Sequence, residues 1–354
     1  MERVSGRQLN MIGAMFMYPT ALIYLPGTLM TFARQDAWFA VFLPLGVMLA
    51  VLWVMSRVSA RFPGMDLFAA MISRYPVAGR LLAGGYIAFF FLVLIRDLRT
   101  LVDFVDVTLL PATPMVIAGA LVAFSTVLIA RGGIEVVARV TELFAPSLIA
   151  ITLALPLLTA NSLELRFLAP VFEYGIGPSL HAGWLVGAWI GEIALLPLIF
   201  PGQTFRFRDG AYGMVLSVLL FEIVLVVELL LLGPNLGSRP LFPTWEAVRH
   251  IRLTDFLDRW DLVLVGIWFP SVVTKVSYGL YVMCHGLERI SRSLDPRPLS
   301  TALGLFALVV SLWAFENSMD VVLLHHLWPW IALVFEIAVP ALLFLVLRPA
   351  RSSS

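Results

Sequence analysis

The sequence predicts an all-α polytopic membrane protein with ten transmembrane helices in two inverted repeats of five. Its composition is the first reason: of 354 residues, 60% are hydrophobic and 13% are charged, and the mean hydropathy is +0.93. The second reason is that apolar runs recur along the whole chain, many of them near the roughly 20 residues that span a bilayer as a helix. The third is that the first and sixth runs carry related glycine and proline interruptions, as inverted-repeat transporters do.

The ten runs divide into a first repeat (8–159) and a second repeat (180–347) of one transmembrane domain, 1–354. The third and eighth runs are long, which predicts tilt or extension beyond the bilayer. Segment 233–259 is the one sizeable outer loop, and Trp245, Val248 and Phe256 predict a short surface helix within it. The runs lie at 8–32, 37–56, 78–110, 115–130, 136–159, 180–200, 211–232, 260–288, 300–317 and 328–347.

Basic residues predict the orientation of the spans. With the amino terminus in the cytoplasm, fifteen arginines fall on the inner side and six on the outer side, as the positive-inside rule requires. Arg96, Arg99 and Lys275 lie within spans. An even number of spans then places both termini in the cytoplasm.

The first span is expected to be broken at Pro19 and to end at Pro26–Gly27. Proline removes a backbone donor and clashes with the preceding turn, and broken backbone is tolerated in a membrane only when buried in protein or lining a cavity. The sixth span repeats this pattern, with Gly187 and Gly191 at its expected break and Phe200-Pro201-Gly202 at its end. The two breaks predict a ligand site at the membrane midplane.

Charged residues in the third span form a pattern with two interpretations. Arg96, Arg99, Asp103 and Asp106 share one helical face, and Arg99 can pair with Asp103 at i,i+4. This stripe either lines an outer vestibule or packs, self-neutralised, against a neighbouring helix or a partner subunit. Asp97 lies about a quarter-turn away, where it can approach a ligand.

Two further ionisable residues lie within spans, where each charge is costly and needs a partner or a function. Glu192, beside Gly191, either accepts the free donors of a half-helix start or binds a ligand ammonium or a proton. Lys275, the only lysine, either takes the place of a coupling cation between spans one and eight or pairs with a carboxylate or unwound carbonyls. Three other glutamates are expected to face an interface or a partner subunit: Glu222, Glu228 and Glu336.

No catalytic or cofactor motif is present, so we expect no enzyme activity, no cofactor and no metal site. The sequence has no phosphate loop or nucleophile elbow, its five histidines lack metal-ligand spacing, and Cys284 is its single cysteine. A net charge of +1 gives no reason to expect nucleic acid as a partner. No small-residue cleavage site follows the first apolar run, so no cleaved signal peptide is expected.

Several motifs in the same order resemble the B subunit of spore germinant receptors, a branch of the amino acid/polyamine/organocation superfamily. They are SGRQL at Ser5–Leu9, YPTALIYLPG, the QDAW turn, Arg99 with LLPATP, RGGIEVVARVTELFAP at Arg131–Pro146, LFPTWEAVRHI and DRWDLVLVGIWFPSVVTKVSYGLY. The likeness covers nearly the whole chain. One departure is Pro-Thr-Ala where the family has a glycine-rich turn in span one.

The resemblance implies a LeuT-like fold with a small-molecule pocket between spans one, three, six and eight. It also implies a nutrient-sensing role in the spore inner membrane, together with an A subunit and a lipoprotein C subunit. A bulky tryptophan at the pocket, Trp189, favours either a small ligand or a partly filled site. Mapped onto this chain, the pocket positions are Pro19, Thr20, Ala21, Val93, Asp97, Trp189, Glu192 and Thr274.

The primary hypothesis is a germinant-receptor subunit that binds a small nutrient, an amino acid in the first instance, through half-helix ends. The second is a proton- or cation-coupled amino-acid transporter, with Glu192 or Lys275 as the coupling group. The third is a membrane scaffold whose pocket is vestigial. One fold can host all three functions, so the site must separate them.

Overall fold

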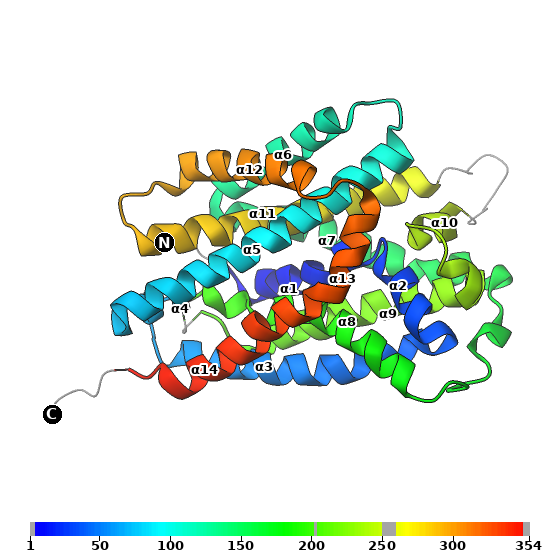
Figure 1. Cartoon of the computed structure of the whole chain (residues 1–354), viewed down its shortest axis with the longest axis horizontal. Coiled ribbons are helices and arrows are strands. Elements are labelled where there is room, and N and C mark those ends of the chain that lie inside the picture. Colours follow the sequence, from blue (N-terminus) through cyan, green and yellow to red (C-terminus); the bar gives the residue numbers. More distant parts are fainter. Residues whose placement is uncertain (1–3, 202–203, 250–259, 350–354) are drawn as a thin grey trace.

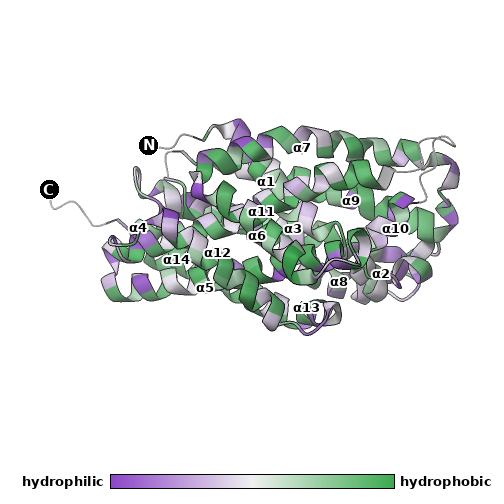
Figure 2. Ribbon diagram, turned by 90° about the horizontal axis from the view of Figure 1, so that it is seen from above, coloured by the Kyte–Doolittle hydropathy of each residue, from purple (hydrophilic) through white to green (hydrophobic). Residues whose placement is uncertain are grey.

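The computed structural model describes residues 4–201, 204–249 and 260–349, and these form helices and turns with no β-strand. Among them, eight helices are long and apolar enough to span a membrane, and Met115–Arg131 is a shorter apolar helix. Figure 2 shows apolar residues along the helices and polar residues gathered toward the two ends of the bundle. The all-α membrane fold is thus confirmed, while the count of ten spans stays a prediction.

The helical elements follow one another with short connections. They are α1 (Gly6–Ala21), α2 (Leu25–Ala33), η1 (Arg34–Val41), α3 (Phe42–Ala60), α4 (Leu67–Arg74), α5 (Pro76–Phe104), η2 (Val105–Leu109), α6 (Met115–Arg131), α7 (Gly133–Leu158), η3 (Ala160–Ser162), η4 (Leu165–Leu168), α8 (Gly177–Ala194), η5 (Leu196–Leu198), α9 (Phe207–Gly237), α10 (Pro243–Arg249), α11 (Trp260–Ile290), α12 (Pro296–Trp313), α13 (Ser318–Ala332), η6 (Leu333–Ala338) and α14 (Val339–Val346).

Each of the first nine predicted runs coincides with one of these elements or with two that follow each other, and the last run overlaps three, α13, η6 and α14. The last run begins earlier than expected, because α13 starts at Ser318 and a π-helical turn, η6, joins it to α14. The predicted outer loop is shorter, because α9 continues to Gly237, and it contains the expected short helix, α10, in which Trp245 and Val248 are buried. The expectation for Phe256 lies outside the described residues.

Helix α1 lies at the centre of the bundle (Figure 1), in contact with α7, α8, α9 and α11. Ser5 and Gln8 start it with a capping box, in which each side chain bonds the other's backbone amide. Two glycines let α1 and α9 touch: a Cβ built on Gly213 would lie 2.8 Å from Cα of Gly13 and 2.8 Å from the Asn10 carbonyl oxygen. The central position of α1 therefore depends on residues without side chains.

The first break is confirmed, but it lies later than predicted. Pro19, Thr20 and Ala21 all belong to α1, and the chain turns at Leu22–Tyr24 before α2 begins. Proline is tolerated here because side chains of neighbouring helices form hydrogen bonds with the backbone around it. Trp268 Nε1 donates to the Pro19 carbonyl at 2.6 Å, and Ser217 Oγ accepts from the Tyr18 amide at 3.1 Å.

The second break also lies later than predicted. Gly187, Gly191 and Glu192 are helical residues of α8, which ends at Ala194, and the interruption begins at η5 around Pro197. The glycines serve close packing instead of unwinding. A Cβ on Gly187 would lie 3.1 Å from Pro44 of α3, and one on Gly191 would overlap the carboxyl group of Glu336.

A polar contact fastens α4 to the end of α11. Asp66 caps α4 by accepting from the Ala69 amide at 2.9 Å, and its other oxygen lies 2.9 and 2.8 Å from Nε and Nη2 of Arg289 and 3.3 Å from Nε2 of His285. Burial alone raises the pKa of Asp66. The bond and charge of His285, the amide and Arg289 outweigh burial and hold the pKa below its ordinary value of 3.8.

Candidate functional site

Four charged side chains meet in the interior, and we call Arg96, Asp97, Glu192 and Lys275 the charge quartet. Arg96 Nη2 lies 2.7 Å from Oδ1 of Asp97 and 2.7 Å from Oε1 of Glu192. Lys275 Nζ lies 2.9 Å from Oε2 of Glu192 and also bonds Oδ2 of Asp97. Each carboxylate therefore holds both cations, and helices α5, α8 and α11 are joined at one point.

The quartet is buried and electrically neutral. Its members are at most 4% exposed, and two cations face two carboxylates. A buried charge is tolerated only when it is paired and hydrogen-bonded, and the mutual pairing in the quartet meets that condition. Because every charge already has a partner, a charged ligand group must either displace one of these partners or use a donor or acceptor that they leave unoccupied.

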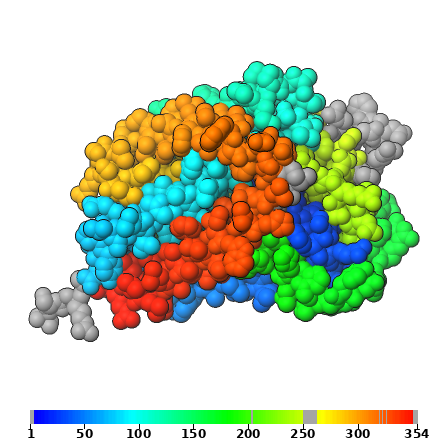
Figure 3. Space-filling model, viewed as in Figure 1, coloured from blue at the N-terminus to red at the C-terminus, as the bar shows by residue number. Residues whose placement is uncertain are grey.

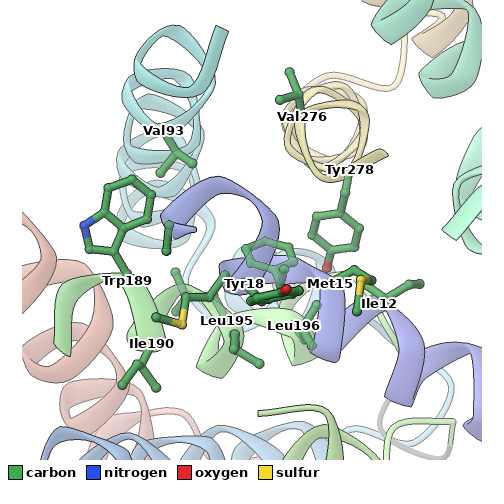
Figure 4. Packing of buried hydrophobic residues seen from close by; sticks show 14 of the residues in the cluster. Ile12, Met15, Tyr18, Val93, Trp189, Ile190, Leu195, Leu196, Val276 and Tyr278 are labelled. Atoms are coloured by element: carbon green, nitrogen blue, oxygen red, sulfur yellow. The ribbon is translucent and has the colours of Figure 1, made fainter. Parts of the chain in front are cut away.

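Two tryptophans enclose the guanidinium of Arg96. Its Cζ lies 3.7 Å from the ring centroid of Trp189 and 4.4 Å from that of Trp328. Figure 4 shows Trp189 with Val93 at the edge of the apolar core that α1 fills with Met15 and Tyr18. Cation–π contact strengthens when it is desolvated, so the rings fix the arginine as well as excluding water.

The guanidinium of Arg96 still has unused hydrogen-bonding capacity. Arg96 carries five N–H donors, and its Nη1 has no hydrogen-bond partner among the described residues. Buried polar groups are normally satisfied, so an unused charged donor marks a position where an acceptor can bind.

A vestibule lies at the end of the bundle that holds α10. A cavity of about 250 Å³ is lined by Tyr24, Thr28, Arg239 and Leu241, among other residues. Two of these residues also line a second cavity of about 10 Å³ that reaches Thr100, whose hydroxyl donates to the Arg96 carbonyl at 3.0 Å. Tyr24 and Leu241 thus line both cavities.

The structure brings together three of the predicted pocket residues, Asp97, Trp189 and Glu192, with Lys275. Of the two alternatives for Lys275, the structure shows the one in which its amine pairs with carboxylates. The predicted hydroxyls are occupied in their own helices: Thr20 donates to the Met17 carbonyl at 3.0 Å, and Thr274 donates to that of Ser271 at 2.7 Å.

In the predicted stripe of the third span, the pair Arg99–Asp103 is confirmed, whereas the placement of Arg96 is wrong. Arg99 and Asp103 pair at 2.8 Å, and Arg99 also bonds the Phe315 carbonyl, which ties α5 to the start of α13. Arg96 does not belong to that stripe, because its long side chain reaches Asp97 and α8 instead.

Sequence reasoning missed Arg96, Trp328 and Glu336 as neighbours of the site. Glu336 and Glu228 are fully buried, so the prediction that they face an interface is wrong. The sequence did carry a signal for Arg96, because it lies beside Asp97 inside an apolar run. A buried ion pair requires further hydrogen-bond partners, and these would be expected on neighbouring helices. No pattern in the sequence marks Trp328.

Comparison with solved structures defines the class of protein. The fold is similar to that of Mhp1, a nucleobase-cation-symport-1 family transporter, with a TM-score of 0.67 at 15% identity over 97% of this chain and 77% of that one. It is also similar to a Na⁺-coupled sialic acid symporter, with a TM-score of 0.63 at 11% identity over 95% and 79% of the two chains. The chain is therefore an integral membrane protein with the LeuT-type transporter fold.

Sequence comparison then identifies the family. A family model described as spore germination protein matches residues 3–320, so the chain belongs to the spore germination protein family. The Bacillus subtilis (strain 168) protein YfkT, named for spore germination, is 29% identical over 348 residues, 98% of this chain and 97% of that protein. Spore germination protein KB of the same organism is 28% identical over 370 residues, 97% of this chain and 94% of that protein.

Proposed function

We propose that this protein is the nutrient-binding subunit of a spore germinant receptor and that its charge quartet binds a small zwitterion, in the first instance an amino acid. The neutral, fully paired quartet carries this proposal. A zwitterion presents one carboxylate and one ammonium, so it can take a place on both sides of the cluster without burying net charge. An anion or a cation alone would leave the interior charged, which is costly.

Both charged groups of the ligand form contacts with the quartet. The ligand carboxylate binds Arg96, whose unused Nη1 offers it donors, while the ligand ammonium takes over a carboxylate oxygen that Lys275 or Arg96 now occupies. Trp189 and Trp328 bound the space, which favours a small side chain on the ligand. Pro19, Thr20, Ala21, Val93 and Thr274 form the surrounding wall in this proposal.

The family supports the setting of the proposal. In it, the protein lies in the spore inner membrane with both termini in the cytoplasm, and the vestibule at the α10 end faces outward. Signalling passes through A and C subunits, which respond to the arrangement that the ligand favours. A ligand shifts such an equilibrium only by its differential affinity for the two states.

The test is a screen of amino acids for thermal stabilisation of the purified protein, followed by measurement of each dissociation constant. Glu192→Gln removes one charge of the quartet and is expected to weaken binding by at least about 30-fold, since truncating a buried charge pair costs about 2–5 kcal/mol. Glu316→Gln, an exposed glutamate, is the matched control and should bind as wild type does. Binding of the same strength in Glu192→Gln would refute the assignment of the site.

The fold of transporters makes a proton- or cation-coupled amino-acid transporter the second candidate. Proteoliposome uptake of the stabilising amino acid, with and without a proton or sodium gradient, separates the two. Binding without uptake fits a receptor that uses the exchange for signalling. Uptake driven by a gradient would make transport the primary function.

A further inference from the structure

A fifth ionisable group lies against the quartet, and it has no partner. Glu336 is fully buried, and neither of its carboxyl oxygens has a hydrogen-bond partner among the described residues. It belongs to η6, a π-helical turn between α13 and α14, which cross the face of the molecule seen in Figure 3. Such single π turns within helices are frequent at functional sites.

The packing holds this carboxyl group close to the quartet. Gly191 makes room for it, since a Cβ there would overlap the carboxyl, and Gly191 directly precedes Glu192 in α8. On its other side Glu336 borders an apolar cavity of about 200 Å³ between α3, α8 and α13. The titratable and charged groups that interact with Glu336 are Glu192 on α8, Arg96 and Tyr86 on α5, and Lys275 on α11. The lining residues from α3 and α13 are all uncharged.

The charge balance around Glu336 favours the protonated form of its carboxyl group. The quartet is already neutral, so an ionised Glu336 would add one uncompensated negative charge to a sealed interior. An isolated carboxylate without donors is very costly there, whereas a protonated carboxyl leaves only an unsatisfied polar group. Apart from Glu336, the described residues that line the neighbouring cavity carry no side-chain oxygen that could ligate a metal cation in place of a proton.

Glu336 and Arg96 have complementary unused capacity. The arginine has a free Nη1 donor, and the glutamate has two free acceptor oxygens. When the proton leaves Glu336 for water, the resulting carboxylate can satisfy Nη1 of Arg96 after a side-chain rearrangement. It then occupies the donors that the ligand carboxylate needs.

We propose that Glu336 is a proton-binding site that competes with the nutrient for Arg96: protonated Glu336 leaves the arginine available, and ionised Glu336 takes it. The proton site stands on the geometry alone, while its coupling to the nutrient rests on the function proposed above. By linkage, proton binding at Glu336 and ligand binding at the quartet strengthen each other equally.

The proton site is tested without any ligand, by infrared spectroscopy of the purified protein at neutral pH. The C=O stretch of a protonated carboxylic acid is expected in the wild type and should lose intensity in Glu336→Gln, while the control Glu316→Gln leaves it unchanged. An identical band in wild type and Glu336→Gln would overturn the proposal. If Glu336→Gln does not fold, Glu336→Asp replaces it, and a band with neither shift nor change of intensity has the same meaning.

The coupling is tested with the stabilising amino acid found in the screen, titrated at a series of pH values. One coupled proton weakens wild-type binding by up to about 10-fold per pH unit once Glu336 ionises. Glu336→Gln, which cannot ionise, should keep the affinity of the acidic wild type throughout. Parallel loss of affinity in both would overturn the coupling. If no amino acid binds at any pH, the proposed function fails, while the infrared result still decides the proton site.

Discussion

Removing the amine of Lys275 tests whether the quartet is one neutral unit. Lys275→Met keeps an unbranched side chain of similar length but removes the charge that contacts Asp97 and Glu192. Arg96 alone then faces two carboxylates, and the interior carries one unpaired negative charge. The expected result is a large loss of stability, recovered when one carboxylate is also neutralised.

The magnitude follows from the cost of breaking a buried ion pair. Removing one partner typically costs about 3–5 kcal/mol, because the other charge stays buried and unpaired. Stability changes of 1 kcal/mol shift the melting temperature by roughly 2–4 °C in chains of 150–250 residues, and by less in larger ones. For the 354 residues of this chain, an unfolding entropy of about 2.1 cal/mol/K per residue gives a shift of about 1.3 °C per kcal/mol, so Lys275→Met should lower the apparent melting temperature by roughly 4–7 °C.

The assay is thermal unfolding in detergent at a fixed heating rate, because membrane proteins often unfold irreversibly and the scan then reports a rate. The double variant Lys275→Met/Asp97→Asn restores neutrality and should recover at least half of the loss. Arg292→Gln, an exposed cation, is the control and should shift stability by no more than about 0.5 kcal/mol. A double variant as unstable as Lys275→Met would refute the reasoning that charge balance holds the quartet together.

Two further predictions concern positions away from the site. Asp66→Asn keeps the helix cap but loses the carboxylate charge that faces Arg289, so it should cost about 1–2 kcal/mol at neutral pH. Because the folded-state pKa of Asp66 lies below 3.8, its contribution is complete above that pH and is lost as the pH falls further; a pH series of melting curves should therefore show wild type and Asp66→Asn converging only in acid. Gly213→Ala places a Cβ against Gly13 of α1 and should cost about 1–3 kcal/mol, measured by the same melting assay, whereas Gly46→Ala, with open space around it, should not destabilise.

The helices could be predicted from sequence because span length and apolar composition are local properties. Lys275 and Glu192 could be singled out for a similar reason, since an ionisable residue in an apolar run needs a partner wherever the run packs. The predicted breaks were displaced by about a turn in α1. Trp268 and Ser217 support the backbone around Pro19 there, and they lie far away in the sequence.

Partners across helices were the part that local patterns could not supply. Helical periodicity assigned Arg96 to a stripe, but an arginine side chain is long enough that its face does not fix its partner. Glu336 was expected at an interface because apolar runs do not show which of their faces points inward. Only the packed structure shows Gly191 leaving room for that carboxyl group beside the quartet.

A paired and neutral site suits a sensor better than an open one. In the structure each charge of the quartet pairs with charges inside the quartet, so the cluster needs no further counter-charge. The zwitterion proposed above would offer the same kinds of pair in exchange, so the two proposed states would differ by a few contacts instead of by a buried charge. A small difference in free energy is what a population shift requires, because a ligand can reverse an equilibrium only when its differential affinity exceeds the initial bias. Neutralising any single member of the quartet should therefore shift the equilibrium between the two proposed states and also weaken ligand binding. The two effects should appear together in the same variant.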